Sequence, residues 1–148
     1  MTKTDFERIH RFNCLASDLD ALYHQAAKKL GISDSALCVL YMIHENGTHC
    51  PLSDIYKKTG NSKQTIHSAV RKLEQEGILY LEQPHGRSKE VCLTEQGKRY
   101  VMQTAARLFE AECSAFHSWT EEEINTYLHL MEKYNLSLRS ELKKLDLE

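Results

Sequence analysis

A chain of 148 residues is long enough for one well-cored domain and too short for two ordinary ones. Apolar residues make up 41% and charged residues 27% of the chain, which is typical of a folded globular protein and excludes a disordered one. The longest apolar run, residues 36–43, is far shorter than the roughly 18 residues of a membrane span, so no membrane partner is expected.

The N-terminus and the cysteines indicate where the protein works. Charged residues such as Lys3, Asp5 and Glu7 leave no apolar stretch for a signal peptide. The five cysteines are odd in number and form no CxxC pair, as expected of reduced thiols. We therefore expect a cytoplasmic protein.

Charge is unevenly distributed along the chain. The net charge is −2, yet residues 51–90 carry seven basic and five acidic side chains, so this segment is +2 and the rest is −4. A mildly basic middle between acidic ends favours a DNA-binding module flanked by elements that do not bind DNA.

The N-terminal segment predicts a long helix. Thr4 with Glu7 three residues later forms a capping-box pattern. Apolar residues then recur at roughly helical spacing, and Gly31 is expected to end the helix in the left-handed conformation.

The middle of the chain predicts a helix-turn-helix. Helices are expected over residues 33–46, 52–58 and 61–76. The first of them is apolar on all sides at its centre and should be buried. The last two are joined by a tight turn at Gly60, with Asn61 expected as N-cap and Gln64 at the capping-box position.

A β-hairpin is expected directly after these helices. Residues 78–83 and 89–93 have the character of strands, and residues 84–88 between them have the composition of a hairpin loop. A hairpin in this position is the wing of a winged helix.

The C-terminal part predicts two further helices. Thr94 should cap one that extends to about His117, and Thr120 with Glu123 forms a capping box for the last. The expected fold class is therefore mainly α with a small β-hairpin wing, a winged helix-turn-helix flanked by long N- and C-terminal helices.

Four blocks of sequence, in this order and spacing, resemble the MarR family. They are Leu52-Ser53-Asp54-Ile55, Lys63-Gln64-Thr65-Ile66, residues 73–79 (Leu-Glu-Gln-Glu-Gly-Ile-Leu) and residues 91–97 (Val-Cys-Leu-Thr-Glu-Gln-Gly). The resemblance covers nearly the whole chain, and the Leu-Thr-x-x-Gly after the wing is its most specific part. It implies a single MarR-type domain over residues 1–148. Its winged-helix lobe would span residues 33–97, with dimerisation helices at 1–32 and 98–148.

The third helix of the predicted helix-turn-helix lobe is expected to enter the major groove of DNA. At 100° per residue, Ile66, Ala69, Val70 and Leu73 fall on one face and should pack inward. On the outer face, Gln can pair with adenine and Arg with guanine. The expected DNA-contacting residues are Ser62, Lys63, Gln64, Thr65, His67, Ser68 and Arg71, with Arg87 and Lys89 on the wing. The alternative is a solvated polar face without a partner.

On the wing, Arg87 is expected to reach the minor groove and Lys89 a phosphate. Here the sequence departs from the family, which usually has an Asp two residues before the wing-tip arginine, where this chain has His85.

The long apolar terminal helices predict a homodimer, because a small winged helix cannot cover them alone. A twofold dimer would present two recognition helices to a pseudo-palindromic site on double-stranded DNA. The resemblance further implies a small-molecule effector between the dimer helices and the DNA-binding lobe. Its candidate residues are Phe12, Cys14, Tyr41, His44 and Phe109. The alternative for this cluster is plain core.

Other chemistry is weakly represented. Cys113 and His117 stand four residues apart, and Cys14 lies where a hydroperoxide-sensing branch of the family has its reactive thiol, but no metal site or cofactor is expected. No catalytic motif is present, so an enzyme is not expected. The leading hypothesis is a sequence-specific transcriptional regulator, a repressor by resemblance. A winged helix that binds protein instead of DNA and, more distantly, a metal-dependent enzyme remain alternatives.

Overall fold

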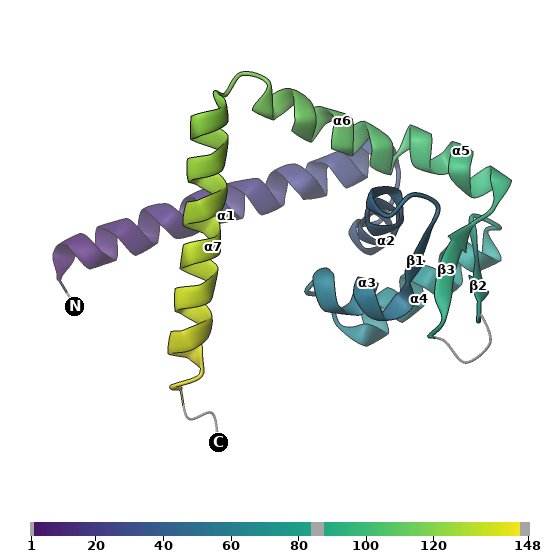
Figure 1. The fold of residues 1–148 in the computed structure, drawn as a ribbon, viewed down its shortest axis with the longest axis horizontal. Coiled ribbons are helices and arrows are strands. Elements are labelled where there is room, and N and C mark those ends of the chain that lie inside the picture. The colour runs from purple at the N-terminus through teal and green to yellow at the C-terminus, as the bar shows by residue number, and fades with distance from the viewer. Residues whose placement is uncertain (1, 84–87, 146–148) are drawn as a thin grey trace. The chain divides into compact units, whose positions relative to one another are not determined.

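The computed structural model describes residues 2–83 and 88–145, and this part of the chain forms seven helices and a three-stranded sheet (Figure 1). In chain order the elements are α1 (Lys3–Leu30), α2 (Asp34–Glu45), β1 (His49–Pro51), α3 (Leu52–Lys58), α4 (Lys63–Gln75), β2 (Leu79–Glu82), β3 (Glu90–Leu93), α5 (Glu95–Gln103), α6 (Ala105–Phe116) and α7 (Glu121–Leu142). The chain divides into two compact units, one ending at Phe109 and one beginning at Glu110. The predicted fold class is confirmed.

Helix α1 begins two residues earlier than the sequence pattern indicated. Its N-cap is Thr2, whose Oγ1 accepts from the backbone N–H of Asp5, while the Asp5 carboxylate accepts from the N–H of Thr2. The predicted Thr4–Glu7 capping box is therefore wrong, because Thr4 already lies within the helix. The predicted end is confirmed, since Gly31 adopts the left-handed conformation with φ of 69°.

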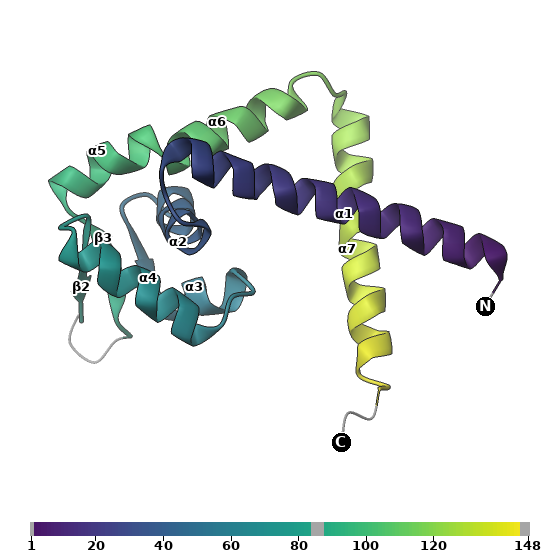
Figure 2. The ribbon, with the colours of Figure 1, turned by 180° about the vertical axis from the view of Figure 1, so that it is seen from behind.

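Helix α2 forms the centre of the first unit, as predicted. Val39, Leu40 and Ile43 have no exposed surface. Helix α4 packs against α2 through Ile66, Ala69, Val70 and Leu73, all buried, and Figure 2 shows the two helices from the α4 side. The predicted inward face of this helix is confirmed.

The turn between α3 and α4 differs from the prediction by one residue. Ser62, not Asn61, is the N-cap of α4: its backbone is extended and its Oγ accepts from the N–H of Thr65 at 3.1 Å. Asn61 instead donates through Nδ2 to the carbonyl of Thr59 and to Sγ of Cys38 in α2. The expected capping-box role of Gln64 is therefore also wrong, because Thr65, not Gln64, lies three residues after the N-cap Ser62.

The sheet has the strand order β1-β3-β2 with both pairs antiparallel. Strands β2 and β3 are the two predicted strands of the wing, whereas β1 was not anticipated. Val91 pairs with Cys50 of β1 on one side and with Leu81 of β2 on the other, and it is fully buried. The expected hairpin loop falls largely on residues 84–87, which lie outside the described residues.

The helix predicted from Thr94 to His117 is two helices. Thr94 is the N-cap, as expected. At Thr104 the backbone leaves the helical region with φ of −125° and ψ of −90°, and the buried Thr104 hydroxyl donates to the carbonyl of Tyr100 at 2.7 Å. A side chain that bonds one turn back competes with the helical backbone, and α6 restarts at Ala105.

Helix α7 begins at the predicted capping box. The Thr120 side chain accepts from the N–H of Glu123, and the Glu123 carboxylate accepts from the N–H of Thr120. No residue of α7 is buried, although the helix is rich in leucine. None of the helices in the described part of the chain has the length and apolar character needed to cross a membrane.

Candidate nucleic-acid interface

Helix α4 presents a polar face away from the core. Gln64, His67, Ser68 and Arg71 are all exposed, opposite the buried residues that pack against α2. Among the described residues, the side chains of Gln64, His67 and Arg71 have no hydrogen-bond or ion-pair partner. Lys72 on the flank differs, because its ammonium lies 4.0 Å from the Glu76 carboxylate. This outer face therefore consists of side chains with free donors and acceptors on a rigidly anchored helix.

The N-terminal turn of α4 is organised by its cap. Ser62 and Thr65 are exposed, and their hydroxyl oxygens lie 2.8 Å apart in a hydrogen bond. Because the Ser62 oxygen also accepts from the Thr65 N–H, both hydroxyls are partly engaged within the helix. Lys63 beside them is exposed and unconstrained. The turn thus presents a helix N-terminus and a cation, a combination suited to a phosphate.

The base of the wing is attached to α3. Lys89 is exposed, and its backbone carbonyl accepts from the N–H of Leu52, the first residue of α3, at 2.9 Å. The wing-tip prediction concerns Arg87 and His85, which lie outside the described residues. Of the predicted wing contacts, the structure thus places Lys89 only.

The C-terminal end of α4 is held by the block that most resembled the MarR family. The hydroxyl of Thr94 donates to the carbonyl of Gly77 at 2.6 Å and accepts from the N–H of Gly97 at 2.9 Å. Gly77 follows α4 with a positive φ of 70°, a conformation that favours glycine. Sequence reasoning identified this block by resemblance but did not identify its task of holding the end of the candidate recognition helix.

Asn61 holds the other end of α4 and was also missed as a positioning residue. Its amide joins the turn to Cys38 of α2, with Nδ2 3.7 Å from Sγ. Burial raises the pKa of the Cys38 thiol above its usual value, so it stays a neutral partner for the amide. The only signal in the sequence was the polar residue before the helix, which was assigned to the cap instead.

Three of the five candidate effector residues lie together. The ring of Phe109 lies 6.1 Å from that of Tyr41 and 5.5 Å from that of His44, in tilted and edge-on geometry. Tyr41 and His44 are half-buried in α2. Phe12 and Cys14 lie on the exposed part of α1, where Cys14 Sγ is 3.7 Å from Nε2 of His10. The grouping of Tyr41, His44 and Phe109 links α2 to the start of α6.

Metal binding finds no support in residues 2–83 and 88–145, where no three His, Cys, Asp or Glu side chains are grouped to hold an ion. Cys113 and His117 are both exposed. Cys50 is buried, its thiol donates to the carbonyl of Pro51, and burial raises its pKa. Such a protonated thiol is a poor metal ligand.

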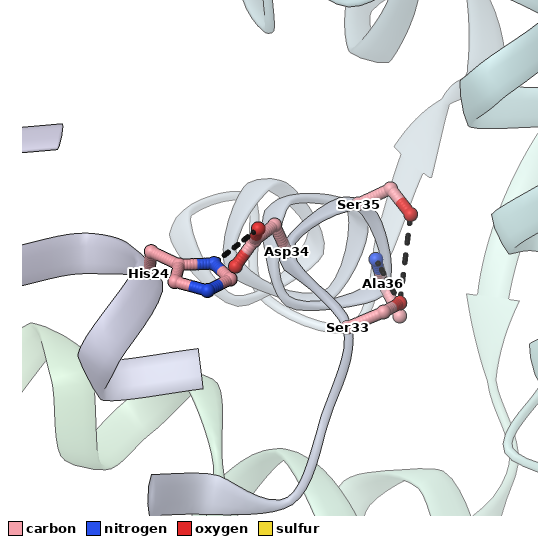
Figure 3. A network of polar contacts seen from close by, with 5 residues as sticks. All are labelled: His24, Ser33, Asp34, Ser35 and Ala36. Carbon is pink, nitrogen blue, oxygen red and sulfur yellow. Dashed lines mark hydrogen bonds and ion pairs between the residues drawn. The ribbon is translucent and has the colours of Figure 1, made fainter. Parts of the chain in front are cut away.

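A further polar network lies where α1 meets α2 (Figure 3). Nδ1 of His24 lies 2.8 Å from Oδ2 of Asp34, and Ser33 caps α2 by accepting from the N–H of Ala36. Both members of the His24–Asp34 pair are exposed, so the pair adds little stability and mainly orients the corner between the two helices.

Residues 30–88 match the model of the MarR family. A comparison with curated protein sequences gives no match. Many solved structures share the fold. A MarR family regulator from Neisseria meningitidis has a TM-score of 0.78 and 17% identity, over 97% of this chain and 99% of that one.

Two other similar structures were solved in functional contexts. A MarR family transcriptional regulator from Listeria monocytogenes, complexed with a 26mer DNA, has a TM-score of 0.70 and 19% identity, over 95% of this chain and 96% of that one. BpsR of Bordetella bronchiseptica, whose DNA binding is regulated by 6-hydroxynicotinic acid, has a TM-score of 0.66 and 19% identity, over 87% and 98%.

At these low identities the solved structures show that the fold is shared. The family model adds a sequence match over residues 30–88, which lie in the central lobe. The matched segment contains α2, α3, α4 and β2, which are the elements that build and anchor the outer face described above. Residues 30–88 are therefore similar in sequence to the MarR family, and the chain shares the fold of MarR family regulators.

Proposed function

We propose that this protein is a transcriptional repressor that binds a pseudo-palindromic operator in double-stranded DNA as a homodimer. The observation that carries the proposal is the exposed polar outer face of α4, where Gln64, His67 and Arg71 have no side-chain partner among the described residues, on a helix whose inner face is buried. A helix held in this way can enter a major groove without rearranging.

Within that interface, different residues take different tasks. Gln64 and Arg71 are the proposed base readers, because their side chains can form bidentate contacts with adenine and guanine. His67 and Ser68 lie between them. Ser62, Lys63 and Thr65 at the helix N-terminus are assigned to phosphates or adjoining base edges, and on the wing Lys89 takes a phosphate and Arg87 the minor groove.

The homodimer is proposed on the apolar surface of the terminal helices. Phe6 and Leu15 of α1 are 67% and 60% exposed, and α7 carries further exposed leucines. A second copy covering these surfaces would remove them from water. Twofold symmetry would then place two α4 helices at successive major grooves, about 34–36 Å apart. In this proposal residues 33–97 are the DNA-binding lobe of one MarR-type domain.

A small-molecule effector is proposed at the aromatic group of Tyr41, His44 and Phe109, with Phe12 and Cys14 as further lining residues. The description of BpsR as regulated by 6-hydroxynicotinic acid supports a search for such ligands. An effector changes DNA affinity only if it binds one arrangement of the protein more tightly than another.

DNA binding is tested by selecting fragments from a random duplex library and measuring their affinity at several salt concentrations. Affinity should fall steeply between about 50 and 200 mM salt, because phosphate contacts release counterions. Arg107→Ala, an exposed arginine of α6, is the matched control for loss of a surface cation. No selected sequence and no salt dependence would favour the alternative, a winged helix that binds protein.

A further inference from the structure

Two carboxylates lie opposite each other at the base of the wing. Glu82 is the last residue of β2 and Glu90 is the first of β3, and the two residues are partners in the antiparallel register. Because side chains alternate along a strand, both belong to the face of the sheet opposite the buried side chain of Val91. Like charges in this position destabilise an antiparallel pair of strands.

No cation offsets this pair within residues 2–83 and 88–145, where none of the ion pairs includes Glu82 or Glu90. Oε2 of Glu82 accepts instead from the thiol of Cys92, whose Sγ is 3.8 Å away. Burial raises the pKa of the Cys92 thiol, and the negative charges of Glu82 and Glu90 raise it further. The fields of both carboxylates therefore act on the same part of the sheet.

The positive charge of the lobe lies on its helices and not on the wing. Residues 52–75, which span α3 and α4, hold five basic and two acidic side chains, for a net charge of +3. Residues 79–93, which span β2 and β3, hold two of each, because Glu82 and Glu90 balance Arg87 and Lys89. The wing therefore has no net charge with which to attract phosphates.

We infer that Glu82 and Glu90 limit the affinity of this protein for DNA of any sequence, by repelling the phosphates that the wing approaches. Glu90 directly follows Lys89, the proposed phosphate contact on the wing. Electrostatic repulsion falls off over about 10 Å at roughly 0.1 M salt, which is more than twice the roughly 3.8 Å between neighbouring Cα atoms. The inference rests on the proposed DNA binding and adds to it two residues that oppose binding.

This repulsion differs in kind from the proposed base readout by Gln64 and Arg71. Phosphates are the same in every sequence, so a carboxylate near them weakens binding to all DNA alike. Removing the carboxylate should strengthen binding to the operator and to random DNA by the same factor, whereas loss of a base reader lowers the preference for the operator. The pair thus reduces the occupancy of the many sequences that compete with the operator.

Glu82→Gln and Glu90→Gln in the full-length protein test the inference, with fluorescence anisotropy on two probes, the duplex selected from the random library and an unselected duplex of equal length. Each variant should bind both duplexes roughly two- to fivefold more tightly at about 50 mM salt, and the gain should shrink towards about 200 mM as salt screens the repulsion. Two controls should bind as the wild type does. Glu82→Asp keeps the charge, and Glu7→Gln removes one at the exposed start of α1.

The double variant Glu82→Gln/Glu90→Gln separates the repulsion within the pair from the repulsion of DNA. Removing either charge abolishes the mutual repulsion, so the midpoint of urea unfolding should rise by nearly the same amount in both single variants and in the double variant. Each carboxylate repels phosphates on its own account, so the gains in DNA affinity should multiply. Two unrelated surface glutamates would not give this combination.

The outcomes separate the inference from the function it rests on. A wild-type protein that binds neither duplex would contradict the proposed function itself. Binding that is unchanged in both glutamine variants would overturn the inference and leave the function standing, because the phosphates would then lie beyond the reach of the wing base. Weaker binding would also overturn it, since the carboxylates would then contribute to the contact with DNA. Tighter binding to both duplexes by one factor, with multiplied gains in the double variant, would establish it.

Discussion

Gly97 of α5 lies directly against the backbone carbonyl of Ile78, the third residue after α4. A Cβ atom at Gly97 would overlap the Ile78 oxygen and lie 2.9 Å from its carbonyl carbon. The N–H of Thr94 donates to the same carbonyl at 3.1 Å, and the Thr94 hydroxyl contacts Gly77. The end of the candidate recognition helix is therefore held on the start of α5 by backbone contacts that only glycine permits.

Gly97→Ala should destabilise the protein by about 1–3 kcal/mol, because the backbone must move to accommodate the methyl group. The sign of the change is informative, since alanine in place of glycine within a helix ordinarily stabilises by about 1 kcal/mol. Urea unfolding followed by circular dichroism measures the difference. A stabilised variant would show that the contact with Ile78 is easily relieved.

Gln64→Ala and Arg71→Ala should each weaken operator binding by about 1–3 kcal/mol and relax the preference at one base position. Gln75→Ala, an exposed change at the far end of α4, is the matched control and should bind as the wild type does. Competition between single-base variants of the operator measures both effects. Unchanged affinity and specificity in both variants would mean that another face of α4 meets the DNA.

Arg87→Ala should weaken binding and flatten the slope of log affinity against log salt by about one, because one phosphate-region contact is lost. Preference at major-groove positions should change little. Fluorescence anisotropy over a range of salt concentrations measures the slope. A slope equal to that of the wild type would mean that the wing tip does not contact DNA in this protein.

Leu128→Asp and Leu138→Asp should split or unfold the dimer, because each would bury an unpaired charge in the proposed interface. Leu136→Asp is the matched control, since helical spacing places Leu136 on another face of α7 than Leu128 and Leu138, and its side chain is 69% exposed. Sedimentation velocity shows the assembly state and circular dichroism shows whether the monomer is folded. Dimers that persist in both the Leu128 and the Leu138 variants would mean that the interface lies on another surface.

Stability should fall at alkaline pH because of the half-buried and buried thiols. Burial raises the pKa of Cys38, Cys50 and Cys92 in the folded state. The unfolded chain releases these protons near pH 8.5, so the stabilisation is present below about that pH and is lost as the pH rises further. Urea unfolding at neutral pH and near pH 10 measures the loss. A Cys50→Ala/Cys92→Ala protein should lose less stability over this range, and an equal loss in both proteins would assign the effect to other groups.

Local signals in the sequence determined the main elements. The capping box at Thr120 and Glu123, the left-handed cap at Gly31 and the inward face of α4 were all predicted and are confirmed. Each depends on residues within a turn or two of one another, so a single stretch of chain contains the necessary information. The same reasoning misplaced the start of α4 by one residue, because Asn61 and Ser62 are equally good N-caps and the choice depends on the contact of Asn61 with Cys38.

Other features were decided only by tertiary structure. Strand β1 is three residues long, which is too short to show the alternation of apolar and polar residues that predicts a strand. It forms because His49–Pro51 pairs with β3 some forty residues later. The break at Thr104 occurs inside a segment whose sequence pattern predicts one continuous helix. The aromatic contact of Phe109 with Tyr41 and His44 and the approach of Gly97 to Ile78 likewise join distant or separately folded segments. Such contacts depend on how whole elements pack in three dimensions, and hydrophobic periodicity shows which face of an element is buried but not which residue it meets.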